Sequence, residues 1–167
     1  MSSDDRARLE SVTATLRDAS ARGDVLPEVI RFAAGSFSRV AMFMVRGQQV
    51  AGMAQSGFEE DGGPNDLELR AMTFEHDECS LFRRAVDERR PIRGVAQNDG
   101  DRRLLTMLGG MSPEEAYLAP IESGGQVVAI LYADNLPADR PIEDTSALEV
   151  VLHHAGLSLD RTALADS

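Results

Sequence analysis

The sequence predicts an α+β fold, in which helices pack on one antiparallel β-sheet and the terminal helices share one face of that sheet. Two observations lead to this prediction. Two pairs of short apolar segments are each joined by a polar turn, which is typical of β-hairpins and therefore of antiparallel strands. Segments with apolar residues at helical spacing begin and end the chain. This arrangement is typical of α+β proteins.

Two helices are expected before the first strand. The first has one apolar face, with residues at steps of three and four: Leu9, Val12, Leu16 and Ala19. Gly23 ends this helix, and Asp24 can cap a second one. The second helix is expected from about 25 to 37, where apolar residues again recur at helical spacing.

The two hairpins are expected at 40–54 and 115–134, with their turns at 46–49 and 123–125. The first strand of the first hairpin and the second strand of the second hairpin are continuously apolar. Strands of this kind are covered on both faces. We therefore expect these two strands at the centre of the sheet, with further layers on both sides.

The other elements follow from shorter signals. We expect a strand or irregular segment at 67–75, a helix at 80–89, a strand at 92–96 and helical turns at 102–108. Gly and Pro mark loops at 59–66 and 135–141. The last helix, from about 144 to 164, has the clearest stripe, formed by Leu148, Val151, Leu152, Ala155 and Leu159.

Length and charge restrict the class of protein. With 167 residues the chain is the size of one domain. We divide it into a helical extension at 1–23, a domain at 24–164 and a tail at 165–167. The formal net charge is −11, so no nucleic-acid partner is expected. All 17 basic residues are arginine, which excludes lysine-dependent chemistry, and a single cysteine excludes an internal disulfide.

No apolar run approaches the ~18 residues of a membrane span, and the first residues do not form a secretory signal. We expect no membrane partner and a cytoplasmic location.

Four segments resemble parts of GAF domains and follow the order of that family. Arg39–Phe58 is similar to the first hairpin, and Ser80–Gly94 is similar to the middle helix and the strand after it. Leu118–Asn135 resembles the last hairpin, including its final Tyr-x-Asp, and Asp144–Leu164 looks like the closing helix. The resemblance covers about residues 24–164.

The resemblance implies a six-stranded antiparallel sheet, with the terminal helices on one face and short helices and loops on the other. In this family the terminal helices commonly dimerise, and the other side commonly holds a small molecule. We therefore expect a non-catalytic, bacterial-type regulatory module for signal transduction. It would sense a small molecule or relay a signal through dimerisation to a protein partner. The alternative is an interaction scaffold without a ligand.

Departures from the family narrow the ligand classes, and we expect no cofactor. The stretch 134–144 lacks the Lys and Phe of the cyclic-nucleotide signature. Cys79 is followed by Ser80, whereas bilin-binding members often have Cys followed by His. One cysteine is too few for the methionine sulfoxide reductases of this fold.

If a ligand pocket exists, we expect it between the sheet and the segments 74–86 and 102–117, because pockets open more easily beside short or irregular elements. The expected lining is Phe74, Cys79, Phe82, Leu104, Met107 and Tyr117. An anion-binding rim is expected at Arg83, Arg93 and Arg102; the alternative is a solvated face balanced by Asp87 and Glu88.

No metal site is expected. Ligands to one ion rarely adjoin in sequence, as they would in 75–79. His153 and His154 point about 100° apart on a helix, so we expect solvated or interface histidines. Cys79 is expected to be an unreactive core thiol, because acidic neighbours oppose a lowered pKa.

A homodimer is expected through the first and last helices. The first helix adds a third apolar stripe to two that already cover one sheet face, and a helix of this length is unstable alone. Its expected interface residues are Leu9, Val12, Leu16 and Ala19. The alternatives are docking on its own domain and fraying of the terminus.

Overall fold

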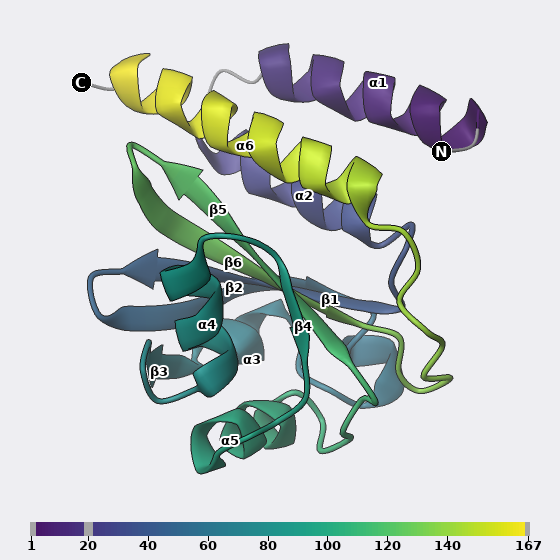
Figure 1. The fold of residues 1–167 in the computed structure, drawn as a ribbon, viewed down its shortest axis with the longest axis vertical. Coiled ribbons are helices and arrows are strands. Elements are labelled where there is room, and N and C mark those ends of the chain that lie inside the picture. Colours follow the sequence, from purple (N-terminus) through teal and green to yellow (C-terminus); the bar gives the residue numbers. More distant parts are fainter. Residues whose placement is uncertain (1–2, 19–21, 166–167) are drawn as a thin grey trace.

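The computed structural model describes residues 3–18 and 22–165, and within them a six-stranded antiparallel sheet lies between two helical layers (Figure 1). The strand order is β3-β2-β1-β6-β5-β4. The strands are β1 (Arg39–Arg46), β2 (Gln49–Ser56), β3 (Thr73–Glu75), β4 (Ile92–Gly94), β5 (Ala116–Ser123) and β6 (Gln126–Asp134). The helices are α1 (Ser3–Asp18), α2 (Val25–Ala33), α3 (Asp66–Arg70), α4 (Ser80–Glu88), α5 (Asp99–Met107) and α6 (Ser146–Ala165), with 3-10 turns η1 (Arg22–Asp24) and η2 (Glu59–Asp61).

The two continuously apolar strands, β1 and β6, pair with each other at the centre of the sheet, as predicted. Their side chains alternate between the two faces. Met42 and its partner Leu131 face the layer of α1, α2 and α6, whereas Phe43 and its partner Ile130 face α3, α4 and α5. All four are fully buried. The α+β prediction is confirmed.

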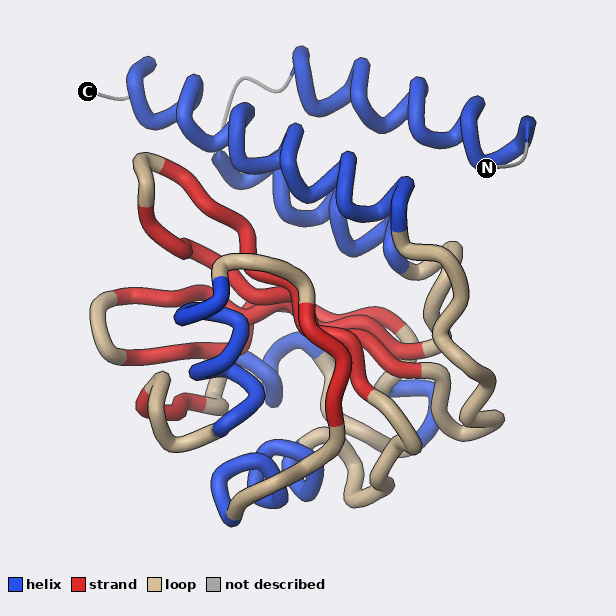
Figure 2. The backbone as a smooth tube through the Cα atoms, in the orientation of Figure 1, coloured by secondary structure: helices blue, strands red, loops and turns tan. Residues whose placement is uncertain are grey.

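The helical layer on one face of the sheet consists of α2 and α6, which contact the strands, and of α1, which packs on these two helices (Figure 2). The middle of this layer is α6, which contacts both α1 and α2. The second helix is shorter than predicted. From Gly35 the backbone hydrogen bonds span three residues instead of four: Gly35 N donates to Phe32 O, and Ser36 N donates to Ala33 O. The chain then turns into β1, so α2 ends at Ala33.

The sequence predicted a strand or an irregular segment at 67–75, whereas the structure has the short helix α3 at Asp66–Arg70. Asn65 caps this helix: its side chain accepts a hydrogen bond from Glu68 N (2.8 Å), and the Glu68 side chain accepts one from Asn65 N (3.2 Å). This reciprocal pair is a capping box, with Asn in the place of the more usual Ser or Thr. The helix lasts five residues, and β3 follows it.

Of the described helices, none combines the length and the apolar character needed to cross a bilayer.

Candidate functional site

Aromatic side chains occupy the expected pocket between the sheet and α4. Phe82 lies 5.0 Å from Phe43 and 5.7 Å from Phe74, measured between ring centroids. These three rings, with Cys79 and Leu104, are at most 2% exposed and belong to one core cluster. These predicted lining residues do lie together between the sheet and α4. In this structure their own side chains occupy the volume of the expected pocket.

Two residues of the predicted pocket belong to the opposite face of the sheet. Arg93 of β4 and Tyr117 of β5 are cross-strand partners, so their side chains share one face. The Tyr117 ring stacks on Phe37 at 5.3 Å, within the core beneath α2 and α6. The Arg93 guanidinium donates to Glu143 O at 3.0 Å, in the segment before α6. Assigning these two residues to the pocket was wrong, because strand alternation turns them away from α4 and α5.

The predicted arginine rim is not assembled around one opening. Arg83 is exposed on α4, Arg102 is paired with Asp99 of its own helix at 3.1 Å, and Arg93 lies on the other face.

Other arginines of this region are also paired: Arg84 and Arg90 both bind Glu88. The hydrogen bonds from these two arginines lower the pKa of the Glu88 carboxyl. This pattern matches the alternative of a solvated, charge-balanced face. Met107 is half-buried at the edge of the core.

Cys79 is part of a connection between α4 and α5. Its thiol donates to Gly100 O at 3.2 Å. Burial, followed by the negative charges of Asp101 and Glu78, raises the pKa of Cys79 to about 12. The thiol is therefore protonated at neutral pH, which makes it a poor nucleophile.

Asp101 is the centre of this connection. Its buried carboxylate accepts hydrogen bonds from Leu81 N (3.0 Å), Gln97 N (2.9 Å) and the Ser80 hydroxyl. It satisfies a free N–H group at the start of α4 and fixes the loop before α5. We read this carboxylate as structural, because each of these contacts lies within the chain.

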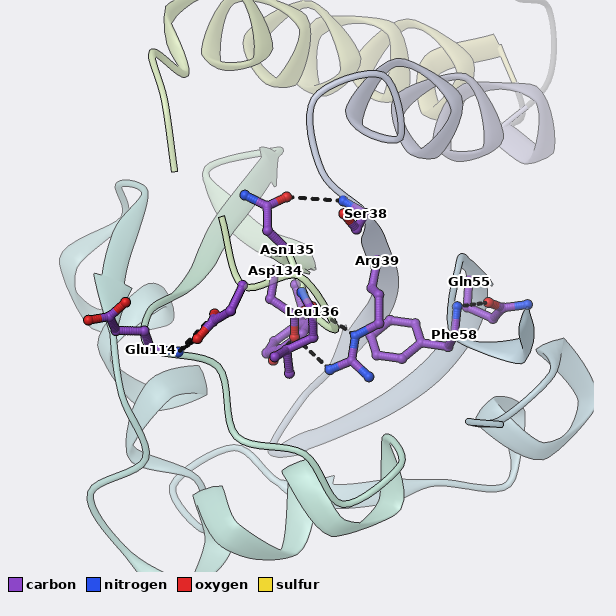
Figure 3. A network of polar contacts seen from close by, with 10 residues as sticks. Ser38, Arg39, Gln55, Phe58, Glu114, Asp134, Asn135 and Leu136 are labelled. Atoms are coloured by element: carbon purple, nitrogen blue, oxygen red, sulfur yellow. Dashed lines mark hydrogen bonds and ion pairs between the residues drawn. The ribbon is translucent and has the colours of Figure 1, made fainter. Parts of the chain in front are cut away.

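A second buried polar network lies where the start of β1 and the end of β6 meet the loop after β2 (Figure 3). The Arg39 guanidinium forms two 2.8 Å bonds to Asp134 and lies over the Phe58 ring at 4.4 Å. The Tyr132 hydroxyl donates to the same carboxylate at 2.7 Å. Burial raises the pKa of Tyr132, so it remains a neutral donor. Leu136 N donates to Asp134 as well, at 3.2 Å. The sequence signal for this network is the Tyr-x-Asp that ends β6.

The apolar stripe of α1 packs on its own domain. Val12 and Leu16 are buried in the core shared with α2 and α6. The Leu16 carbonyl accepts hydrogen bonds from Ser158 Oγ (2.7 Å) and from Arg161 Nη2 (2.8 Å). Leu9 is half-buried beside the same core, and Ala19 lies outside the described residues. The predicted use of Val12 and Leu16 as dimer contacts is therefore corrected, because the chain's own helices already bury them.

The outer face of α6 carries exposed apolar residues that the sequence reading did not single out. Val150 is 40% exposed and Leu157 is 48% exposed. They are seven residues apart, so they lie two turns apart on one side of the helix. His153 is exposed between them, and its ring lies 5.9 Å from that of His154. The seven-residue spacing was available in the sequence, but the stronger inner stripe of the helix obscured it.

Within the residues that the structure describes, no three His, Cys, Asp or Glu side chains are grouped to hold a metal ion.

Comparison with known proteins identifies the architecture. No family model matches the sequence, and no curated protein matches it. Solved structures do match along almost the whole chain. The phycoerythrobilin-bound GAF domain from a cyanobacterial phytochrome superposes with a TM-score of 0.73 at 14% identity, covering 100% of both chains. The GAF domain from a Coxiella burnetii phosphoenolpyruvate-protein phosphotransferase gives 0.71 at 14% identity, covering 97% of this chain and 96% of that one. This chain has the GAF fold.

A GAF domain/HD domain protein from Geobacter sulfurreducens is a third match, with a TM-score of 0.68, 15% identity, and coverage of 91% of this chain and 98% of that one. Proteins with GAF domains are typically sensory or regulatory. In the GAF fold of this chain, the α4 side holds packed aromatic rings, and the helical layer on the other side exposes the outer face of α6.

Proposed function

We propose that this chain is a non-catalytic, cytoplasmic regulatory module that relays a signal by forming a homodimer through the outer face of α6. The observation that carries the proposal is the pair of exposed apolar side chains on this helix, Val150 and Leu157. Isolated exposed apolar residues are common on protein surfaces. Two on one side of a helix whose opposite stripe is already buried in the core favour a contact with another helix.

A second copy is the partner that fits this pattern. Val150 and Leu157 lie symmetrically about the peptide between His153 and His154. A twofold axis crossing there, with the two helices antiparallel, would place Val150 against Leu157 of the partner subunit. The same patch would then bind itself, as in an isologous dimer. The histidines would meet at the axis.

The packed α4 side favours a function that needs no ligand in that half of the molecule. Phe43, Phe74 and Phe82 occupy the space where a ligand was expected. The second candidate function is therefore an interaction scaffold without a ligand at that position, which binds a different signalling protein through the same α6 face.

Light scattering after size exclusion tests the homodimer. We expect the wild-type chain to elute with twice the 18.1 kDa of one chain. Leu157→Glu and Val150→Glu should each give the single-chain mass, because a buried unpaired charge opposes association. Leu67→Glu is the matched control, since Leu67 is 74% exposed on α3, away from this face.

A single-chain mass for the wild-type protein over a wide concentration range would overturn the homodimer and leave the scaffold. A dimer that persists in both α6 variants would place the interface elsewhere.

A further inference from the structure

A groove of about 640 Å³ opens between the start of α2 and the hairpin end of the sheet. This volume is within the range of small-molecule sites. Its principal lining residues come from α2, β1, β2, β6 and α6: Leu26, Met44, Arg46, Met53, Val128 and Leu159. The groove lies on the face of the sheet that α2 and α6 cover, so it is separate from the packed aromatic side chains under α4. The outer face of α6 is not part of it either.

The groove exists because α2 is too short to cover the whole sheet. This helix begins at Val25 and has nine residues. Along β1, burial decreases from complete at Arg39–Phe43 to exposed at Arg46. Met44 and Met53 therefore remain half-buried at the margin of the core, beside Leu26. Methionine side chains of this kind adapt to the shape of an apolar ligand.

The charge around the groove is asymmetric. Arg46 is the single charged residue of its described lining, and its side chain forms no hydrogen bond or ion pair with the described residues. The neighbouring hollow shares Gly23 and Pro27 with the groove. Its charged lining residues are Asp18, Asp24 and Glu28, of which Glu28 is paired with Arg31 at 2.6 Å, so the balance of charge there is negative. An anion is repelled on that side and attracted at Arg46.

We propose that this groove binds an amphipathic monocarboxylate, such as a medium-chain alkyl acid. The carboxylate would pair with the Arg46 guanidinium, which matches a carboxylate in a two-bond arrangement. The alkyl chain would lie along Met44, Met53 and Leu26. The proposal goes beyond the role of α6 and does not depend on it, so either can fail alone.

The test uses the full chain with decanoate and octanoate, below their micellar concentrations and at physiological salt. Calorimetry measures the dissociation constant, and ¹⁵N NMR locates the site. Decanoate should shift the amide signals of Leu26, Met44, Arg46 and Met53. Each methylene buried should tighten binding about fourfold, so octanoate should bind about 16-fold more weakly than decanoate.

Arg46→Gln should weaken decanoate binding about tenfold or more, the effect expected for loss of a hydrogen bond to a charged group. Arg83→Gln is the matched control, because Arg83 is also exposed but lies on α4. Met53→Gln keeps the side-chain length and should weaken binding severalfold. The midpoint of thermal unfolding of each variant confirms that it is folded.

The proposal is overturned if decanoate does not bind, if Arg46→Gln binds as tightly as the wild-type protein, or if decylammonium binds as tightly as decanoate. It is also overturned if the shifted signals lie on another surface. Leu157→Glu should leave the dissociation constant for decanoate unchanged, which separates this site from the proposed dimer contact.

Discussion

The guanidinium of Arg39 and the carboxylate of Asp134 form a two-bond ion pair in the interior, with Nε–Oδ1 and Nη2–Oδ2 distances of 2.8 Å. The side chains are 1% and 0% exposed. Burial by itself lowers the pKa of Arg39, but the hydrogen bonds and charge of Asp134 outweigh it and raise the pKa overall. The pair joins the start of β1 to the end of β6.

Removing one member of this pair should destabilise the protein strongly. Arg39→Met leaves the Asp134 carboxylate buried without its partner, and we expect a loss of about 3–5 kcal/mol in the free energy of unfolding. The double variant Arg39→Met/Asp134→Leu should lose less than the sum of the two single variants, because it leaves no unpaired buried charge. Urea unfolding measures these differences, and additive losses would show that the two residues are not coupled.

Leu131→Ala tests the centre of the sheet. Leu131 of β6 is fully buried beneath α2 and α6, so truncation should cost about 2–5 kcal/mol. Leu67→Ala is the control, because an exposed side chain should contribute within about 0.5 kcal/mol. A loss well under about 1 kcal/mol for Leu131→Ala would contradict the central position of this residue.

Gly100 permits the close contact between α5 and the residues before α4. A Cβ atom at this position would lie 1.8 Å from Glu78 O, a backbone atom. Gly100→Ala should therefore push α5 away and destabilise the fold by about 1–3 kcal/mol. Gly23→Ala is the matched control, since no atom of the described residues lies within 4 Å of its Cβ position. Equal midpoints of thermal unfolding for the two variants would refute the close approach.

Cys79 should make stability depend on pH in the alkaline range. Burial raises its pKa from 9.0 to about 12, so the folded protein retains this proton over a window in which the unfolded chain releases it. Because the unfolded state then binds fewer protons, the free energy of unfolding should fall as the pH rises from about 9 to 12. Urea titrations should show a shallower fall for Cys79→Ala.

Alkylation provides an independent check on this thiol. Iodoacetamide at pH 8 should modify Cys79 in urea and leave it unmodified in the native protein, since the thiolate is the reactive form. Rapid stoichiometric labelling of the native chain would show that the thiol is accessible and ionised.

Docking of α1 on its own domain predicts a loss of stability in one chain. Leu16→Ala should lower the free energy of unfolding by about 2–5 kcal/mol, because Leu16 is fully buried. Ala14→Ser, at an exposed position of α1, is the control and should have little effect. If Leu16→Ala instead dissociated a dimer without destabilising the chain, α1 would belong to the subunit interface.

Local patterns in the sequence were sufficient to predict the main elements of this protein. Continuous apolar strands predicted the central pair β1 and β6, and helical spacing predicted α6, because these signals depend on side chains a few residues apart. Element ends were less certain. The helix α3 was missed because its signal is a single capping box around Asn65, and α2 stopped early where the chain turns into β1.

Only the tertiary structure determined which part of the chain covers each apolar face. The sequence by itself determined that Leu16 lies on an apolar stripe and that Tyr117 lies in an apolar segment. The tertiary structure decided that Leu16 packs against α6 of the same chain, and that Tyr117 stacks on Phe37 rather than facing α4. The same holds for the groove at Arg46, which depends on how far α2 extends over the sheet. The physical reason is that hydrophobic burial is non-directional, so periodicity shows which residues avoid water, whereas contacts between distant segments determine what covers them.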